Sequence, residues 1–181
     1  MRSVLRVDLI GHGLTAAMRG ARFPVDEELD ASARTGQSDY LPPADARVVL
    51  GPELRVAQTA ARFGLSGDTD DRLRDLDAGS WRGAEMGGLA QDQLFAWLTD
   101  PDFRGHGGES VTEVIERTRY WLAEVAAAGS DTVAVTHPAV VRSAVVVALD
   151  APPTAFWRID VAPASVTRLH FRGQWTLRLT G

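Results

Sequence analysis

The chain has 181 residues, of which 45% are hydrophobic and 24% charged, and these values are typical of a globular protein of one domain. It contains no cysteine, which excludes disulfides, thiolate metal sites and a cysteine nucleophile. All 19 basic residues are arginine, which excludes a lysine Schiff base and the lysine of a phosphate-binding loop. The net charge of -5 gives no electrostatic reason to expect nucleic acid or an anionic membrane as a partner.

Nothing in the sequence predicts a membrane segment, because no window approaches the roughly 18 consecutive apolar residues that a spanning helix needs. The segment from Met1 to Val4 leads directly into a strand pattern, without the apolar region of a signal peptide. We therefore expect a cytoplasmic protein that contacts neither membrane nor nucleic acid.

The first third of the chain predicts two strands and one helix. Apolar residues at 4–10 indicate a buried strand, which is followed at once by Gly11, His12 and Gly13. Residues 14–46 are irregular, with a weak helix pattern around 30–35. A short strand at 47–50 precedes a helix at 53–63.

The rest of the chain alternates helices and strands. We expect a strand edge at 72–77, an insert at about 84–108, and a helix from Ser110 to about Ala127 that begins with a capping box. A strand at 131–136 and a helix to Leu149 come next. Three further strands are predicted, at 155–161, 165–172 and 174–179. This order predicts one α/β domain over residues 1–181, with helices on both faces of the sheet and the insert as a small cap.

Four polar residues lie at or just after the predicted strands. His12 and His137 each come directly after a strand, where the carboxyl ends of parallel strands form the ligand crevice of an α/β sheet. His137 also begins a helix, whose free N–H groups favour an anion. Arg55 lies in the first turn of a helix, and Asp75 lies at another strand edge. Each residue alone is more often structural, but together they predict an anion site.

At this point the chain resembles the histidine phosphatase superfamily, in its phosphoglycerate-mutase-like branch. The resemblance covers nearly the whole chain. It is carried by five segments in the family's order, namely residues 9–15, 50–60, 73–83, 108–110 and 135–142. It implies a three-layer αβα sandwich with a mostly parallel central sheet.

The resemblance also implies a reaction. His12 would attack phosphorus and become phosphohistidine, while Arg55 and His137 hold the phosphoryl oxygens. Asp75 would protonate the leaving oxygen and then activate water, with Asp77 as an alternative for this role. Gly13 and Thr15 of the first segment would bind the substrate, a small phosphate ester. No metal or organic cofactor is needed.

Two residues depart from the family pattern. Gly11 stands where the family has an arginine, and Pro138 stands where it has a glycine whose N–H can face the phosphate. Losing a preorganised donor of this kind can cost about 10²–10³ in rate. Arg19 or Arg22 could replace the lost charge, and both could equally be solvated loop residues.

Other interpretations remain open from the sequence. The pocket could serve a less charged ester or acid–base chemistry, or bind a ligand without catalysis. Two histidines and a carboxylate could also hold non-haem iron, although Arg55 would repel a cation. The aromatic residues Trp81, Phe95, Trp97 and Phe103 could line the site or only pack the insert. We expect His106 and His170 to be structural and Arg142 to form a structural ion pair, and the sequence leaves a homodimer open.

Overall fold

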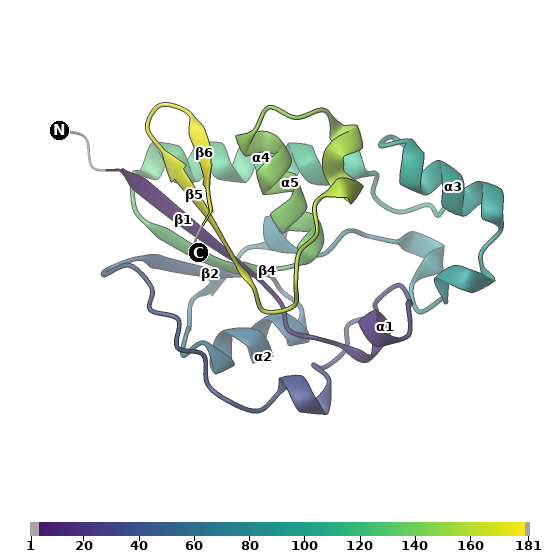
Figure 1. Cartoon of the computed structure of the whole chain (residues 1–181), viewed down its shortest axis with the longest axis horizontal. Helices are drawn as coiled ribbons and strands as arrows, with labels where there is room; N and C mark the ends of the chain where they lie inside the picture. The colour runs from purple at the N-terminus through teal and green to yellow at the C-terminus, as the bar shows by residue number, and fades with distance from the viewer. Residues whose placement is uncertain (1–3, 180–181) are drawn as a thin grey trace.

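The structure is a computed structural model that describes residues 4–179, with a six-stranded sheet at its centre (Figure 1). The strands are β1 (Leu5–Gly11), β2 (Arg47–Leu50), β3 (Asp68–Thr69), β4 (Thr132–Thr136), β5 (Val166–Phe171) and β6 (Trp175–Arg178). Their order across the sheet is β3-β2-β4-β1-β5-β6. The first four in this order are parallel, whereas β5 and β6 run antiparallel. The sheet is therefore mixed, and the expected α/β class is confirmed.

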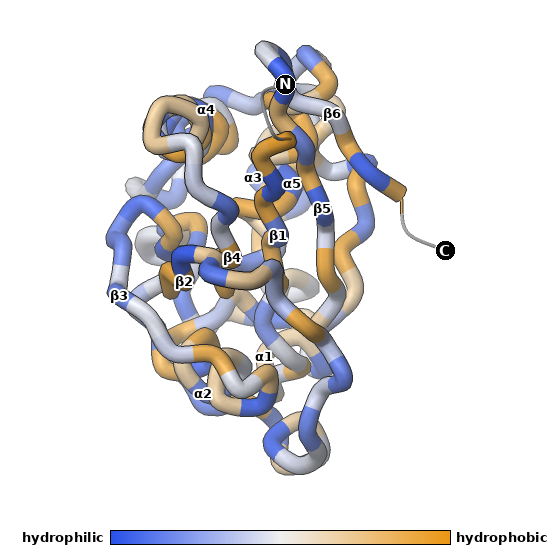
Figure 2. The backbone as a smooth tube through the Cα atoms, turned by 90° about the vertical axis from the view of Figure 1, so that its left-hand side faces the viewer, coloured by the Kyte–Doolittle hydropathy of each residue, from blue (hydrophilic) through white to orange (hydrophobic). Residues whose placement is uncertain are grey.

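Helices cover both faces of this sheet, as Figure 1 shows. They are α1 (Ala16–Arg19), α2 (Leu54–Arg62), α3 (Gln91–Thr99), α4 (Val111–Ala128) and α5 (Pro138–Ala148). Successive residues of β1 point to opposite faces, so Leu9 packs in the core under α4 and α5 while Ile10 packs with α2. In Figure 2 the hydrophobic colours gather along these central strands and the helices that face them.

The ends of α4 follow the predicted chemistry. The Ser110 side chain accepts a hydrogen bond from the Glu113 N–H, and the Glu113 carboxylate accepts one from the Ser110 N–H. Gly129 ends the helix in the left-handed region at φ 69°. The helix is thus confirmed within a residue or two of the expected bounds.

Two predicted strands are wrong. Residues 72–77 contain no strand, because the Asp70 side chain accepts from the Arg72 N–H and starts a 3₁₀ turn at Asp71–Leu73, while the edge strand is β3 just before it. Residues 155–161 likewise belong mostly to a 3₁₀ segment, Pro153–Arg158, whose two prolines favour a helical start. Residues 72–77 bury Leu73, and residues 155–161 bury Phe156 and Val161, without strand pairing in either segment.

The remaining differences are small. The helix expected near 30–35 is a 3₁₀ turn at Ala31–Ala33, and the segment called irregular also contains α1. The insert at 84–108 contains α3 and the 3₁₀ turn Met86–Gly88. Within the described residues no helix has the length and apolarity needed to span a bilayer. Met1 to Ser3, where the sequence predicted a direct start without a leader, lie outside the described residues.

Candidate functional site

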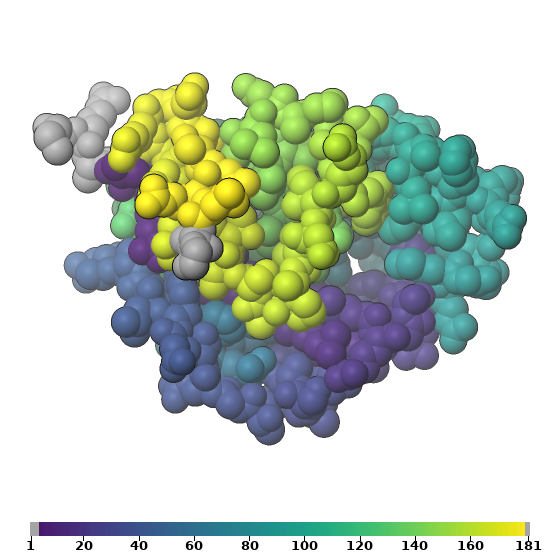
Figure 3. Space-filling model, in the orientation of Figure 1, coloured from purple at the N-terminus to yellow at the C-terminus, as the bar shows by residue number. Residues whose placement is uncertain are grey.

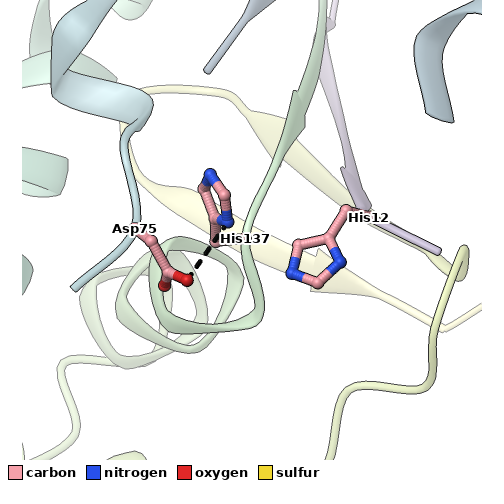
Figure 4. A group of neighbouring side chains, drawn as sticks. All are labelled: His12, Asp75 and His137. Carbon is pink, nitrogen blue, oxygen red and sulfur yellow. Dashed lines mark ion pairs between the residues drawn. The ribbon is translucent and has the colours of Figure 1, made fainter. Parts of the chain in front are cut away.

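The two histidines after the central strands meet at the carboxyl edge of the sheet (Figure 4). β1 and β4 are adjacent and parallel, with Gly11 opposite Thr136, so His12 and His137 leave the sheet side by side. Their ring centroids are 5.1 Å apart. The convergence predicted from the strand order is present in the structure.

His12 is held as a neutral imidazole. Its ring is buried, and Nδ1 lies 2.8 Å from the carbonyl oxygen of Gly13, which can only accept. Nδ1 therefore carries the hydrogen, and Nε2 keeps its lone pair. Burial and the charge of His137 lower the pKa of His12 to about 4, so the ring is unprotonated at neutral pH. A neutral imidazole with an available Nε2 is a nucleophile.

His137 is held in the opposite state. It is fully buried at the start of α5, and Nε2 lies 2.6 Å from Oε2 of Glu53 while Nδ1 lies 3.4 Å from Oδ2 of Asp75. Burial opposes the charged form, but the two carboxylates outweigh it and raise the pKa of His137. His137 therefore favours the protonated state near neutral pH. Nδ1 has no hydrogen-bond partner among the described residues and points toward Asp75.

Arg55 and Asp75 form a largely buried ion pair beside the histidines. The Arg55 side chain is 2% exposed, and its Nη2 donates to Oδ2 of Asp75 at 2.7 Å. Nη1 donates to the carbonyl of Val25, whereas Nε has no partner in the described part of the chain. Burial alone would raise the pKa of Asp75, but the charges of His137 and Arg55 hold it below its usual range. Asp75 is therefore ionised in the free protein.

Glu53 is a member of this cluster that the sequence reasoning missed. Besides its contact with His137, its Oε1 accepts from the backbone N–H of Asp75 at 2.9 Å. The only available signal was its position two residues before Arg55, at the start of the same helix. Arg55 and a protonated His137 offset Asp75 and Glu53, so the cluster carries no net charge before a ligand arrives.

Gly13 and Thr15, predicted to bind substrate, have their polar groups engaged within the protein. The Gly13 N–H donates to Oγ1 of Thr59 at 2.9 Å. Thr15 accepts from the Met18 N–H and caps α1, and it lies on the wall of the cleft described below. Besides the Gly13 carbonyl, which accepts from Nδ1 of His12, these two residues shape the loop after His12.

Asp77 lies apart from the histidines. Its Oδ1 accepts from the Gly79 N–H and from Nη2 of Arg82, both at 2.8 Å. Asp75 is the acid that the structure brings to His12 and His137. Of the two loop arginines expected as possible sources of positive charge, Arg19 is paired with Asp30 on the surface, whereas Arg22 lines the cleft.

A cleft of about 500 Å³ opens beside His12 and Asp75. Figure 3 shows it as the hollow between the purple α1 region, the teal α3 and the yellow-green segment after α5. Most of its wall is apolar, with Met18, Phe23, Trp97 and Trp157 among the large side chains. The insert contributes both to lining and to packing, because its Trp97 lines the cleft, its Phe103 packs with Trp81 behind it, and its Phe95 is exposed.

The same cluster was tested as a metal site. His12, Asp75 and His137 each offer one ligand atom, and these atoms lie within 4.8 Å of one another. However, the Arg55 guanidinium is bonded to the carboxylate that would be the anionic ligand. A cation would have to displace that guanidinium, so the donor set fits an anion better than a metal.

The fold and these side chains define an α/β protein with a paired-histidine anion site at the carboxyl edge of its sheet. Residues 26–180 match the family described as histidine phosphatase superfamily (branch 1), and the chain belongs to this family. The matched segment begins after His12, so the place of His12 rests on the geometry above.

Relatives and solved structures agree with this assignment. The chain is 28% identical to a glucosyl-3-phosphoglycerate phosphatase of Mycobacterium tuberculosis, over 94% of this chain and 86% of the relative. The same values for the enzyme of that name from Mycolicibacterium vanbaalenii are 28%, 86% and 79%. A mycobacterial glucosyl-3-phosphoglycerate phosphatase solved with VO3 has a TM-score of 0.82 at 25% identity, covering 97% of this chain and 98% of its own. The expected family and hydrolase class are thereby confirmed.

A phosphoglycerate mutase from Thermus thermophilus shares the fold, with a TM-score of 0.76 at 22% identity over 97% of each chain. At this identity the similarity concerns the fold alone. It confirms the phosphoglycerate-mutase-like architecture that the sequence predicted.

Proposed function

We propose that the chain hydrolyses a small organic phosphomonoester through a phosphohistidine formed on His12. The observation that carries this proposal is the state of His12, a neutral ring whose Nδ1 is held by the Gly13 carbonyl and whose Nε2 donates to or accepts from no group among residues 4–179. Relatives named as phosphatases support the same reaction class.

The first step forms a bond between His12 Nε2 and phosphorus while the bond from phosphorus to the leaving oxygen breaks. Protonated His137 and Arg55 offer donors that lack partners in the described chain, His137 Nδ1 and Arg55 Nε. Such donors stabilise the charge of the transferring phosphoryl group because they are already oriented before it arrives.

Asp75 supplies the proton for the leaving oxygen. It is ionised in the free protein, but a phosphate dianion beside it disfavours a second negative charge and raises its pKa. The carboxyl group therefore takes up a proton together with the substrate. After the leaving group departs, the Asp75 carboxylate activates water, which attacks phosphorus and releases phosphate and neutral His12.

A neighbouring segment fills the space beside Gly11. A Cβ at position 11 would meet Cγ1 of Val161 at 3.3 Å, so the segment after α5 packs where a larger residue would begin. Arg22, on the cleft wall, is the remaining arginine of the loop that can offer charge to a bound phosphate. Pro138 starts α5 without an N–H, so this residue offers no backbone donor to a bound phosphate, whereas the His137 side chain does.

We further propose that the insert at about 84–108 acts as a cap over the cleft, since Trp97 lies in its wall. The single domain, the cytoplasmic location and the absence of nucleic-acid and membrane partners remain part of the proposal. The acidic net charge of -5 supports the last point.

The test is hydrolysis of p-nitrophenyl phosphate by the native protein and by His12→Ala, with His170→Ala as a matched control on β5. We expect His12→Ala to lose at least about 1000-fold in kcat, as expected for a missing nucleophile, and His170→Ala to behave as the native protein. Equal rates for His12→Ala and the native protein would contradict the proposal.

A second function, binding of a ligand less charged than a phosphate dianion without catalysis, is favoured by one observation, the cancellation of charge within the cluster. An uncharged cluster holds a dianion less strongly than a cationic one. An absence of vanadate binding in calorimetry, together with an absence of turnover on a panel of phosphate esters, would favour this alternative.

A further inference from the structure

Arg142 lies in the wall of the cleft, where the proposed reaction gives it no task. It is five residues after His137, in α5, and its side chain is partly buried. The sequence predicted a structural ion pair for it. In the described part of the chain, no carboxylate lies within ion-pair distance of its guanidinium, and its Nε instead donates to a backbone carbonyl, so the expected ion pair is absent there.

The guanidinium is fixed in place without using its terminal nitrogens. Nε donates to the carbonyl of Ile159 at 2.8 Å. The carbon at the centre of the guanidinium lies 5.8 Å from the centroid of the Phe156 ring and 5.4 Å from that of Trp157. Cation–π contacts of this kind orient an arginine but do not neutralise it. Nη1 and Nη2 donate to no group among residues 4–179, yet they are not sealed in the interior.

The positive charge of Arg142 is not balanced by a carboxylate bonded to it. Burial lowers the pKa of Arg142, and the nearest carboxylates that oppose the effect are Asp160, which is exposed, and Asp75, which is already bonded to Arg55. A partly buried guanidinium with two unused donors is stabilised by an anion that reaches both. The cleft that would deliver such an anion is the one beside His12.

We propose that Arg142 determines substrate specificity by binding a carboxylate on the leaving group. The planar fork of Nη1 and Nη2 matches the two oxygens of a carboxylate. The apolar body between the carboxylate and the phosphate would pack on Trp97, Trp157 and Met18. The substrate class is therefore a phosphomonoester whose alcohol part carries an apolar body and a carboxylate. This inference rests on the proposed function, because it concerns the leaving group of the same reaction.

The test compares phenyl phosphate with 3-carboxyphenyl phosphate, which differ only in the carboxylate. We expect the native protein to prefer the carboxylated ester by about 10-fold to 100-fold in kcat/KM, the range for hydrogen bonds to a charged group. Arg142→Met should bring this ratio close to one, and Arg142→Lys should give an intermediate ratio because lysine keeps the charge without the fork. Arg119→Met, an exposed arginine of α4, is the matched control and should keep the native ratio.

Benzoate binding, followed through the fluorescence of the cleft tryptophans, gives a readout that needs no turnover. Binding to the native protein, much weaker binding to Arg142→Met, and no hydrolysis of either ester would support this inference while contradicting the proposed function. A native protein that shows no preference for the carboxylated ester, or an Arg142→Lys variant that keeps the full preference and the native benzoate affinity, would overturn the inference.

Discussion

Two buried polar clusters lie along β1, and they differ in how completely their hydrogen bonds are satisfied. Asp8, fully buried near the middle of the strand, accepts from Arg6, Arg168 and the Tyr40 hydroxyl. None of its carboxylate oxygens lacks a partner. Four residues later, the cluster around His12 keeps two buried nitrogens, on Arg55 and His137, without a partner in the described chain.

The difference separates structural from functional burial of charge. A buried charge with all partners in place fixes one conformation, because removing any partner leaves an unpaired group. A buried cluster with unused donors is less favourable on its own and becomes satisfied when a ligand arrives. The Asp8 cluster thus holds β1, β5 and the loop at Tyr40 together, whereas the His12 cluster is arranged for an anion.

Among the changes that compare the two clusters, the largest expected effect comes from changing the carboxylate of the His12 cluster. Asp75→Asn removes the proton donor and should lower kcat by about 100-fold or more. Asp77→Asn is the matched control, since Asp77 bonds Gly79 and Arg82 outside the cluster, and its kcat should equal the native value. A larger loss of kcat in Asp77→Asn than in Asp75→Asn would show that Asp77, and not Asp75, is the acid.

The same substitution in the other cluster should act on stability instead. Asp8→Asn leaves Arg6 and Arg168 without their anionic partner, and we expect the free energy of unfolding to fall by about 3 kcal/mol. Urea denaturation measures this, with the exposed Asp39→Asn as control. If Asp8→Asn and the native protein have the same urea midpoint of unfolding, the distinction between the two clusters fails.

A smaller effect is expected from Glu53→Gln, which changes the charge beside His137 but keeps a hydrogen-bonding side chain. Glu53 helps to raise the pKa of His137, and the protonated ring is needed to bind phosphate. The value of kcat/KM should therefore be full below this pKa and decline as pH rises through it. In Glu53→Gln the decline should begin at lower pH.

The control for this pH profile is Glu116→Gln, an exposed residue of α4 paired with Arg119. Its alkaline limb should coincide with that of the native protein. An alkaline limb at the same pH in Glu53→Gln and in the native protein would show that Glu53 does not set the charge of His137.

The smallest effect is expected from removing metal ions. Arg55 occupies the carboxylate that a cation would need, so dialysis against EDTA should leave the rate of phosphate ester hydrolysis unchanged. A rate that falls after EDTA and returns with one added divalent cation would make the His12 cluster a metal site.

The sequence predicts the central residues of the site because their positions follow from the order of the strands. His12 and His137 follow two strands that become neighbours, and Arg55 begins the helix after a third. The strands predicted at 72–77 and 155–161 are wrong because a few apolar residues in a short segment do not distinguish strand pairing from a 3₁₀ turn with a buried side chain.

Other features depend on contacts that only the folded chain creates. Glu53 reaches His137 across 84 residues of sequence, and its position two residues before Arg55 does not identify that partner. Arg142 looks like an ordinary helical arginine until the segment after α5 folds back and supplies the Ile159 carbonyl and the Trp157 ring. Residues whose role depends on such distant partners cannot be assigned from spacing alone.

The most direct test of the account is to locate the phosphoryl group during turnover. Trypsin cleaves after arginine, so His12 lies alone in the peptide 7–19 and His137 lies in the peptide 120–142. After a rapid quench with a slowly hydrolysed phosphate ester, mass spectrometry at neutral to alkaline pH should find an acid-labile phosphoryl group on peptide 7–19. A phosphoryl group on peptide 120–142, or turnover without any labelled histidine, would contradict the account.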